Sequence, residues 1–244
     1  MKNTKSYLQG GKLGDFIHSL MVCKFNWEFF GYKADLYMAN IGDKFEKDLD
    51  FTYNELKPIL EKQEWLNTFN IHTNQEIDIN LCKFRQSRFL YQTGWLELCF
   101  NEFLGGIIPP VEYKWIDLEK DTNMEGVLLI NRSLKPMNKR TCDMYEAVID
   151  EFEKKYFICF DEQQYDNFPL KHKVPMLKVE TLYDFFKKIN GCKLFIGFQS
   201  GPASWATSMN VPRGIELLAR PDSIHYIKDK EYYSQFDYFQ GDAI

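Results

Sequence analysis

Residues 6–30, SYLQGGKLGDFIHSLMVCKFNWEFF, decide the fold class. Residues 6–9 predict a short strand, and residues 10–14 predict a glycine-rich turn. From Asp15 onward, apolar side chains recur at intervals of four, three, four and three residues, at Phe16, Leu20, Cys23, Trp27 and Phe30. That spacing predicts one apolar stripe on a helix, which Gly31 would end. Residues 34–39 predict a second strand. A strand, turn, helix and strand in this order form a βαβ unit and indicate a parallel sheet.

The C-terminal half repeats this alternation. Residues 127–130 are continuously apolar, as a buried parallel strand requires. Further strands are expected at residues 156–160 and 193–197, with helices at 142–155, 182–189 and 203–209. In the middle of the chain, residues 53–69 and 88–104 predict helices. The glycine and proline pairs within residues 105–110 mark a domain boundary. We therefore expect an α/β protein made of two α/β domains, residues 1–108 and 109–244.

The amino-acid composition narrows the possible functions and locations of the protein. The 244 residues include 30 Lys and Arg and 35 Asp and Glu, a net charge of −5, which disfavours nucleic-acid binding by bulk charge but allows a local basic patch. The six cysteines form no CxxC pair, which argues against structural zinc and favours reduced core thiols. Aromatic residues, at 16%, are expected to build the core. Without a signal peptide or a long apolar run, we expect a cytoplasmic protein with no integral membrane segment.

The glycine-rich turn is the first candidate site. Gly11, Lys12 and Gly14 would let the backbone approach an anion in front of the following helix. Asp15 has two interpretations. It caps this helix, or it is a carboxylate at the carboxyl end of the first strand that accepts a proton from a hydroxyl. His18, one helical turn later, either orients a substrate or has a structural role.

Two more candidate segments follow predicted strands of the second half. The turn at residues 199–202 contains Ser200, expected to cap the next helix, and Pro202, which suits a first helical turn. This helix start either binds a diphosphate or is an ordinary capped helix. The other segment is a basic loop that either neutralises a diphosphate or is simply solvated. Its candidate residues are Asn131, Arg132, Ser133, Lys135, Lys139 and Arg140.

In their order and spacing, these segments resemble the heptosyltransferase-like glycosyltransferases, family nine, of the GT-B fold. GKLGDFIHSL at residues 11–20 is similar to the family's Leu-Gly-Asp opening and the His that follows it. FIGFQSGP at 195–202 resembles the donor-site strand and Ser-Gly-Pro turn, and MNVP at 209–212 resembles the segment after the donor-site helix. The strand at 127–130 and its basic loop are similar to the start of the C-terminal domain. Gln199 stands where the family usually has Asp, and Ser204 where it usually has His.

The resemblance implies two Rossmann-like domains with parallel sheets facing a central cleft. The C-terminal domain would bind a nucleotide-diphospho-sugar, and the N-terminal domain would present a saccharide, glycolipid or other hydroxyl acceptor. Asp15 would be the general base of an inverting glycosyltransferase, and His18 would lie on the acceptor side. Neither metal nor cofactor would be needed, because basic side chains and helix N-termini would hold the diphosphate. The donor-binding residues would be Gly11, Lys12, Gly14, Asn131, Arg132, Ser133, Lys139, Arg140, Gln199, Ser200, Gly201, Pro202 and Ser204.

Two alternatives stay open. The departures at Gln199 and Ser204 allow a nucleotide-sugar-binding protein that has lost turnover. The basic loop and the aromatic residues allow a viral-type enzyme that glycosylates a modified DNA base, although the net charge of −5 disfavours it.

Overall fold

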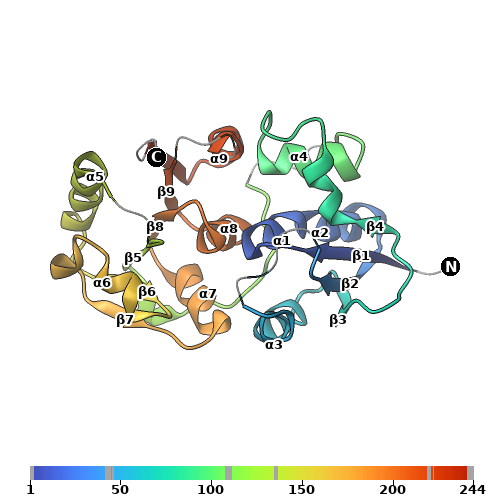
Figure 1. Ribbon diagram of the computed structural model, residues 1–244, viewed down its shortest axis with the longest axis horizontal. Helices are drawn as coiled ribbons and strands as arrows, with labels where there is room; N and C mark the ends of the chain where they lie inside the picture. Colours follow the sequence, from blue (N-terminus) through green and yellow to red (C-terminus); the bar gives the residue numbers. More distant parts are fainter. Residues whose placement is uncertain are drawn as a thin grey trace.

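The computed structural model describes residues 3–41, 45, 47–107, 112–134, 137–218, 221 and 223–240. It contains two sheets, one in each half of the chain, with helices packed around them (Figure 1). Every strand pairing among these residues is parallel, as the βαβ pattern predicts. The α/β class with two parallel sheets is therefore confirmed.

The first sheet has the strand order β3-β2-β1-β4. The predicted unit at its centre is confirmed, with one break: Leu20 separates two helices where one was expected. Gly31, with φ of +74°, ends the second of them as predicted. The elements of this unit are β1 (Thr4–Gly10), α1 (Leu13–Ser19), α2 (Met21–Phe30) and β2 (Lys33–Ala39).

The region between residues 49 and 107 departs further from the sequence prediction. The helix expected over residues 53–69 is α3 (Leu49–Leu60), and β3 (Leu66–Ile71) follows it. β3 is a strand because it pairs with β2 along the sheet edge, a long-range interaction that local apolar spacing does not reveal. The helix expected over residues 88–104 is shorter, because α4 (Trp95–Phe103) begins after Gly94. A two-residue strand, β4 (Ile79–Asn80), and the 3-10 helix η1 (Leu81–Gln86) precede it.

The second sheet has the order β10-β9-β8-β5-β6-β7, the doubly wound arrangement of dinucleotide-binding folds. The strands and helices expected here are confirmed with small shifts of their ends. α5 begins earlier than residue 142 because the side chain of Asn138 accepts a hydrogen bond from the Thr141 backbone N–H. The predicted elements are β5 (Leu128–Asn131), α5 (Lys139–Asp150), β6 (Lys155–Cys159), α7 (Leu182–Gly191), β8 (Leu194–Phe198) and α8 (Gly201–Ser208).

Several elements of the second half were not predicted. They are η2 (Thr122–Met124), α6 (Glu162–Asp166), η3 (Lys171–Lys173), β7 (Met176–Lys178), β9 (Arg213–Leu217), α9 (Ser223–Asp229), η4 (Lys230–Tyr232) and β10 (Phe236–Gln240). β7, β9 and β10 complete the two sides of the sheet.

The two halves pack directly against each other, as Figure 1 shows at its centre. α1 packs on α8, α3 on α7, and α4 on α9. One apolar cluster runs through both halves, and Trp65, Trp115 and Trp205 are among its largest fully buried side chains. The prediction of a core rich in aromatic rings is thus confirmed. The proposed boundary between residues 108 and 109 lies outside the described residues.

All six cysteines are free, and four of them are buried. No described helix combines the length and the apolar character that crossing a membrane requires.

Candidate active site

Each sheet has one position where the strand order reverses, and open α/β sheets bind ligands beyond the carboxyl ends of the strands at such positions. In the first sheet the reversal lies between β1 and β4, and in the second it lies between β5 and β8. Asp15 follows β1, and Ser133 and Ser200 follow β5 and β8. The sequence-predicted segments therefore lie at the two reversals.

Glycines allow the two helices that follow these positions, α1 and α8, to come into contact. A Cβ atom added to Gly14 in α1 would lie 3.0 Å from Ser204 Oγ and 3.7 Å from the Gly201 backbone. In turn, the nearest atom to a Cβ on Gly201 would be Leu13 Cδ2 at 3.6 Å. The first turns of α1 and α8 therefore meet face to face. This contact joins two of the predicted segments, although they are almost 190 residues apart in the sequence.

Asp15 lies within the first turn of α1 rather than at its N-cap. The N-cap is Lys12, which makes no side-chain capping bond, so the interpretation of Asp15 as a cap is wrong. Instead, Arg85 Nη2 donates to Asp15 Oδ2 at 2.5 Å. The two side chains are 25% and 23% exposed, so both are within reach of a ligand. Asp15 is a partly exposed carboxylate just beyond the carboxyl end of β1, which is the position that its functional interpretation assumes.

A buried glutamine fixes the helix turn that carries Asp15. Gln9, at the end of β1, has no exposed surface, and its Nε2 donates to the Asp15 carbonyl oxygen at 3.2 Å and to Ser19 Oγ. Cys82 Sγ donates to Gln9 Oε1 at 3.0 Å. Burial raises the pKa of the Cys82 thiol, so it stays a neutral donor. β1, α1 and η1 are thereby joined beneath the carboxylate.

His18 is buried, one helical turn after Asp15. Its ring stacks on Trp95 with centroids 4.8 Å apart, and neither ring nitrogen has a hydrogen-bond partner among the residues that the structure describes. Burial, with smaller contributions from His225 and Arg213, lowers the pKa of His18 to about 3, so its imidazole is neutral near pH 7. Of the two interpretations of His18, the structure favours the structural one, and the expected acceptor-side position is not observed.

Arg132 is in a buried ion pair rather than in an open basic loop. Its Nε and Nη2 donate to the two carboxylate oxygens of Glu216 in β9, each at 2.7 Å, and the Tyr145 hydroxyl donates to Glu216 Oε2 at 3.1 Å. The expectation that Arg132 holds a diphosphate is therefore not supported, because a buried guanidinium takes the partner that offsets its desolvation. The sequence offers one indication of this ion pair, because the Glu216 carboxylate stands inside an apolar strand and there needs a cation as its partner.

The rest of the basic loop divides into buried and exposed residues. Asn131 Nδ2 donates to the Ile158 carbonyl oxygen at 2.8 Å, which ties β5 to β6. The Ser133 hydroxyl is buried and has no hydrogen-bond partner within the described part of the chain. Lys139 and Arg140 are exposed in the first turn of α5, where the positive end of the helix dipole disfavours cations unless an anion is present. Lys135 lies outside the described residues.

The start of α8 is organised differently from the prediction. Ser200 stands at the N-cap, but its hydroxyl donates to the Phe198 carbonyl oxygen at 3.0 Å and does not cap the helix, so that prediction is wrong. Pro202 lies in the first turn, as expected. Gln199 Oε1 accepts from the Leu218 N–H at 3.0 Å and from Ser223 Oγ at 2.8 Å. Gln199 therefore joins the end of β8 to Leu218 and Ser223.

Arg85 is the functional candidate that sequence reasoning missed. Nothing local marks it, because η1 and the two-residue strand before it have little sequence signal. Gln9 and Cys82 were missed for the same reason, since their roles depend on contacts across the sheet. Within the described part of the chain, no three His, Cys, Asp or Glu side chains are grouped to hold a metal ion.

Comparison with known proteins gives a likeness in structure only. No family model matches the chain, and no curated protein matches its sequence. E. coli heptosyltransferase WaaC with ADP superposes with a TM-score of 0.68 at 9% identity, covering 97% of this chain and 93% of that one. The chain has the heptosyltransferase-like GT-B fold. The fold expected from the sequence resemblance is thus confirmed.

Two further structures share this GT-B fold. The glycosyl transferase family 9 protein from Veillonella parvula DSM 2008 has a TM-score of 0.58 and 13% identity, covering 100% of this chain and 87% of that one. E. coli ADP-heptose LPS heptosyltransferase II has a TM-score of 0.55 and 12% identity, covering 97% and 90%. The agreement extends over both halves, so this shorter GT-B chain keeps the whole two-sheet architecture.

Proposed function

We propose that this protein is an inverting glycosyltransferase that moves a sugar from a nucleotide-diphospho-sugar to an acceptor hydroxyl. One observation carries the proposal: the close contact of Gly14 with Gly201 and Ser204 packs the helix turn that carries Asp15 against the start of α8. A base and an anion-binding helix end are the two parts that such a transfer needs.

On the donor side, the start of α8 and the exposed cations of α5 would hold the diphosphate. The N–H groups of the first α8 turn are not capped by Ser200, and the dipole of the helix favours a negative group there. Lys139 and Arg140 would neutralise the leaving nucleoside diphosphate, and the buried Ser133 hydroxyl would find a partner in it. In this proposal helix ends and side chains supply the neutralisation, so no metal or cofactor takes part.

The choice of donor nucleotide follows from the neighbours. Two of the similar structures are described with ADP or ADP-heptose, so ADP-linked sugars are the first donors to test. Gln199 and Ser204 replace the residues usual in the family, and the sugar itself is therefore left open.

On the acceptor side, Asp15 would take the proton of the attacking hydroxyl. The oxygen then bonds to the anomeric carbon while the bond from that carbon to the diphosphate breaks, and the electron pair leaves with the nucleoside diphosphate. Attack from the face opposite the leaving group inverts the anomeric configuration. Arg85, which holds one oxygen of the carboxylate, would fix its direction. The acceptor class is a saccharide, a glycolipid or another hydroxyl compound.

A two-step experiment tests this function. Thermal-shift screening with nucleotides and nucleotide-sugars identifies the donor, since a ligand at one hundred times its Kd stabilises by about 2.7 kcal/mol. Proton NMR of the product formed with that donor then reports the anomeric configuration. Transfer with inversion supports the proposal, and transfer with retention contradicts it.

A nucleotide-sugar-binding protein without turnover is the second candidate, and specific contacts favour it. Gln199 is occupied by Leu218 and Ser223, and Arg132 is occupied by Glu216. These side chains are held by the protein and not by a donor. Donor binding with neither transfer nor donor hydrolysis, across a broad acceptor panel, would support this function instead.

A further inference from the structure

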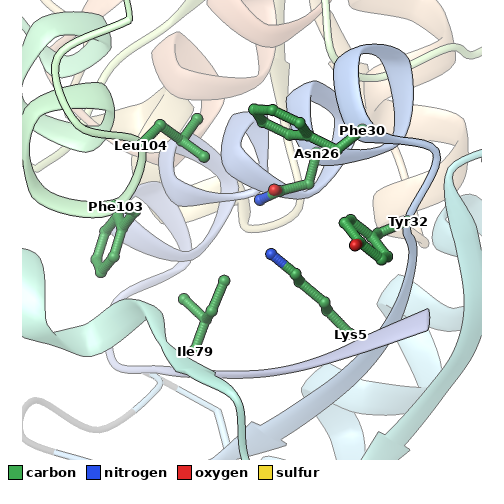
Figure 2. Close-up of a pocket in the computed structure, with 7 residues that line it drawn as sticks. All are labelled: Lys5, Asn26, Phe30, Tyr32, Ile79, Phe103 and Leu104. Atoms are coloured by element: carbon green, nitrogen blue, oxygen red, sulfur yellow. The ribbon is translucent and has the colours of Figure 1, made fainter. Parts of the chain in front are cut away.

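A pocket on the N-terminal half lies away from Asp15. Its volume is about 290 Å³, and it lies between α2, α4 and the starts of β1 and β4 (Figure 2). Lys5, near the start of β1, is five residues before Gly10 at the end of that strand, about 17 Å along it. The pocket and the candidate active site are therefore separate. The lining residues are Lys5, Asn26, Phe30, Tyr32, Ile79, Phe103 and Leu104.

The lining combines two polar side chains, Lys5 and Asn26, with apolar and aromatic ones. Figure 2 shows the Lys5 amine and the Asn26 amide pointing into it. Asn26 is only 1% exposed and is held by a hydrogen bond from its Nδ2 to the Val22 carbonyl oxygen. Phe30, in contrast, is 50% exposed. A ligand that fits would place a polar head inside and an apolar body at the mouth.

The positive charge of Lys5 indicates which charge the polar head of the ligand should have. Its Nζ lies 4.6 Å from the centre of the Tyr32 ring, and among the described residues no carboxylate is within ion-pair distance of it. A partly buried ammonium in apolar surroundings favours an anion as partner. A neutral alcohol would leave the charge unpaired, and a cationic head would be repelled.

Two further exposed apolar side chains neighbour the lining residues in the sequence: Phe29 is 57% exposed, and Ile107, three residues after Leu104, is 48% exposed. Exposed large apolar side chains suit an apolar ligand or partner. A membrane surface would meet outward-facing cations, but here the Lys5 amine points into the pocket (Figure 2). This arrangement favours a single molecule that enters head first.

We propose that this pocket binds a single-chain anionic amphiphile from solution, with its carboxylate or equivalent anionic head on Lys5 and its chain against Phe30, Phe103 and Leu104. The volume of about 290 Å³ is just below the roughly 300–1,000 Å³ of ligand pockets, which limits the ligand to a short chain. Occupancy does not depend on the proposed transferase reaction, and its test needs no turnover.

Isothermal titration with decanoate, below its critical micelle concentration, tests the proposal. Decanoate is expected to bind, while decyltrimethylammonium is expected not to. Lys5→Met should weaken decanoate binding about tenfold or more, and Lys5→Arg should retain it, because a charge-assisted hydrogen bond is worth about that factor. Lys33→Met is the matched control: Lys33 pairs with Thr4 in the sheet, so its side chain faces the side opposite to that of Lys5.

The chain contacts are tested in the same way. Leu104→Asp should abolish decanoate binding, with circular dichroism and the thermal midpoint confirming that each variant is folded. Absence of decanoate binding to the unaltered protein, or equal affinity in Lys5→Met, overturns the proposal. Binding to phosphatidylglycerol vesicles without binding to monomeric decanoate also overturns it and points to a membrane surface.

Discussion

Arg85 donates to Asp15 over 2.5 Å and so joins the segment after β4 to the helix after β1. The pair lies where the first sheet reverses its strand order, next to the contact between α1 and α8. Both residues are about three-quarters covered, so the guanidinium restricts the carboxylate without closing it off. In the proposed reaction, this restriction directs Asp15 toward the acceptor hydroxyl.

Replacing Arg85 with Ala should lower kcat/KM for transfer by about tenfold or more, because a mispositioned base loses much of its contribution to the transition state. The Kd for the donor should change little. The free energy of unfolding should fall by less than about 1 kcal/mol, since the pair is partly exposed. Steady-state kinetics and donor titration measure these effects. Arg88→Ala, an exposed arginine nearby, is the control. Equal kinetics for the two variants would exclude a positioning role for Arg85.

Gly14→Ala tests the contact between α1 and α8. The added Cβ would lie 3.0 Å from Ser204 Oγ, so we expect a loss of about 1 kcal/mol in the free energy of unfolding. Ser204→Ala removes that oxygen, and Gly14→Ala should then cost less in the double variant. Urea denaturation of the four proteins gives the coupling energy. Additive effects would show that the two helices do not meet at these residues.

Arg132 and Glu216 should be coupled strongly. Arg132→Met leaves the Glu216 carboxylate buried without its cation, and we expect a loss of about 3–5 kcal/mol in the free energy of unfolding. Lys178→Met removes one partner of the exposed pair with Glu162 and should cost less than about 1 kcal/mol. Chemical denaturation compares the two. A cost for Arg132→Met as small as that of the surface control would contradict the buried pairing.

Asp229 should give stability an unusual dependence on pH. It is buried between the halves and accepts a hydrogen bond from the Leu96 N–H of α4. Burial raises the pKa of Asp229 from 3.8 to about 8. Between these two values the folded state holds more protons than the unfolded state, so this group lowers stability as pH rises, by roughly 1 kcal/mol per pH unit. Below about pH 4 the effect disappears.

Asp229→Asn removes this titration while retaining an oxygen that accepts from Leu96 N–H. The variant should gain in stability relative to the unaltered protein as pH rises from 5 to 8, as urea denaturation at both values can show. A constant difference between the two proteins over that range would contradict the raised pKa of Asp229.

The parts of the fold that the sequence predicted are those with local signals. The glycine-rich turn before a helical stripe and the continuous apolar run at β5 each require little knowledge of their neighbours. β3 and β4 could not be predicted, because one has the apolar spacing of a helix and the other has only two residues. Their existence depends on pairing with β2 and β1.

The candidate site shows the same difference between residues with a local sequence signal and residues whose roles depend on distant partners. Asp15, Gly14 and the start of α8 were found because strand ends and helix starts are visible in the sequence. The partner of Asp15 is 70 residues away, and that of Arg132 is 84 residues away, so no local pattern reveals them. A segment that is uniformly basic in the sequence thus contains, among its described residues, one buried structural arginine and two exposed cations.

In the proposed function Asp15 is the base of the transfer reaction, and paired measurements on Asp15→Asn test this role. With the donor identified by screening, titration gives its Kd and a transfer assay gives kcat, with Asp50→Asn, at an exposed position of α3, as the control. We predict that Asp15→Asn binds the donor normally and loses about 10²–10⁴-fold in kcat, the contribution of a positioned base, while the control is unchanged. Unchanged turnover in Asp15→Asn would contradict the account.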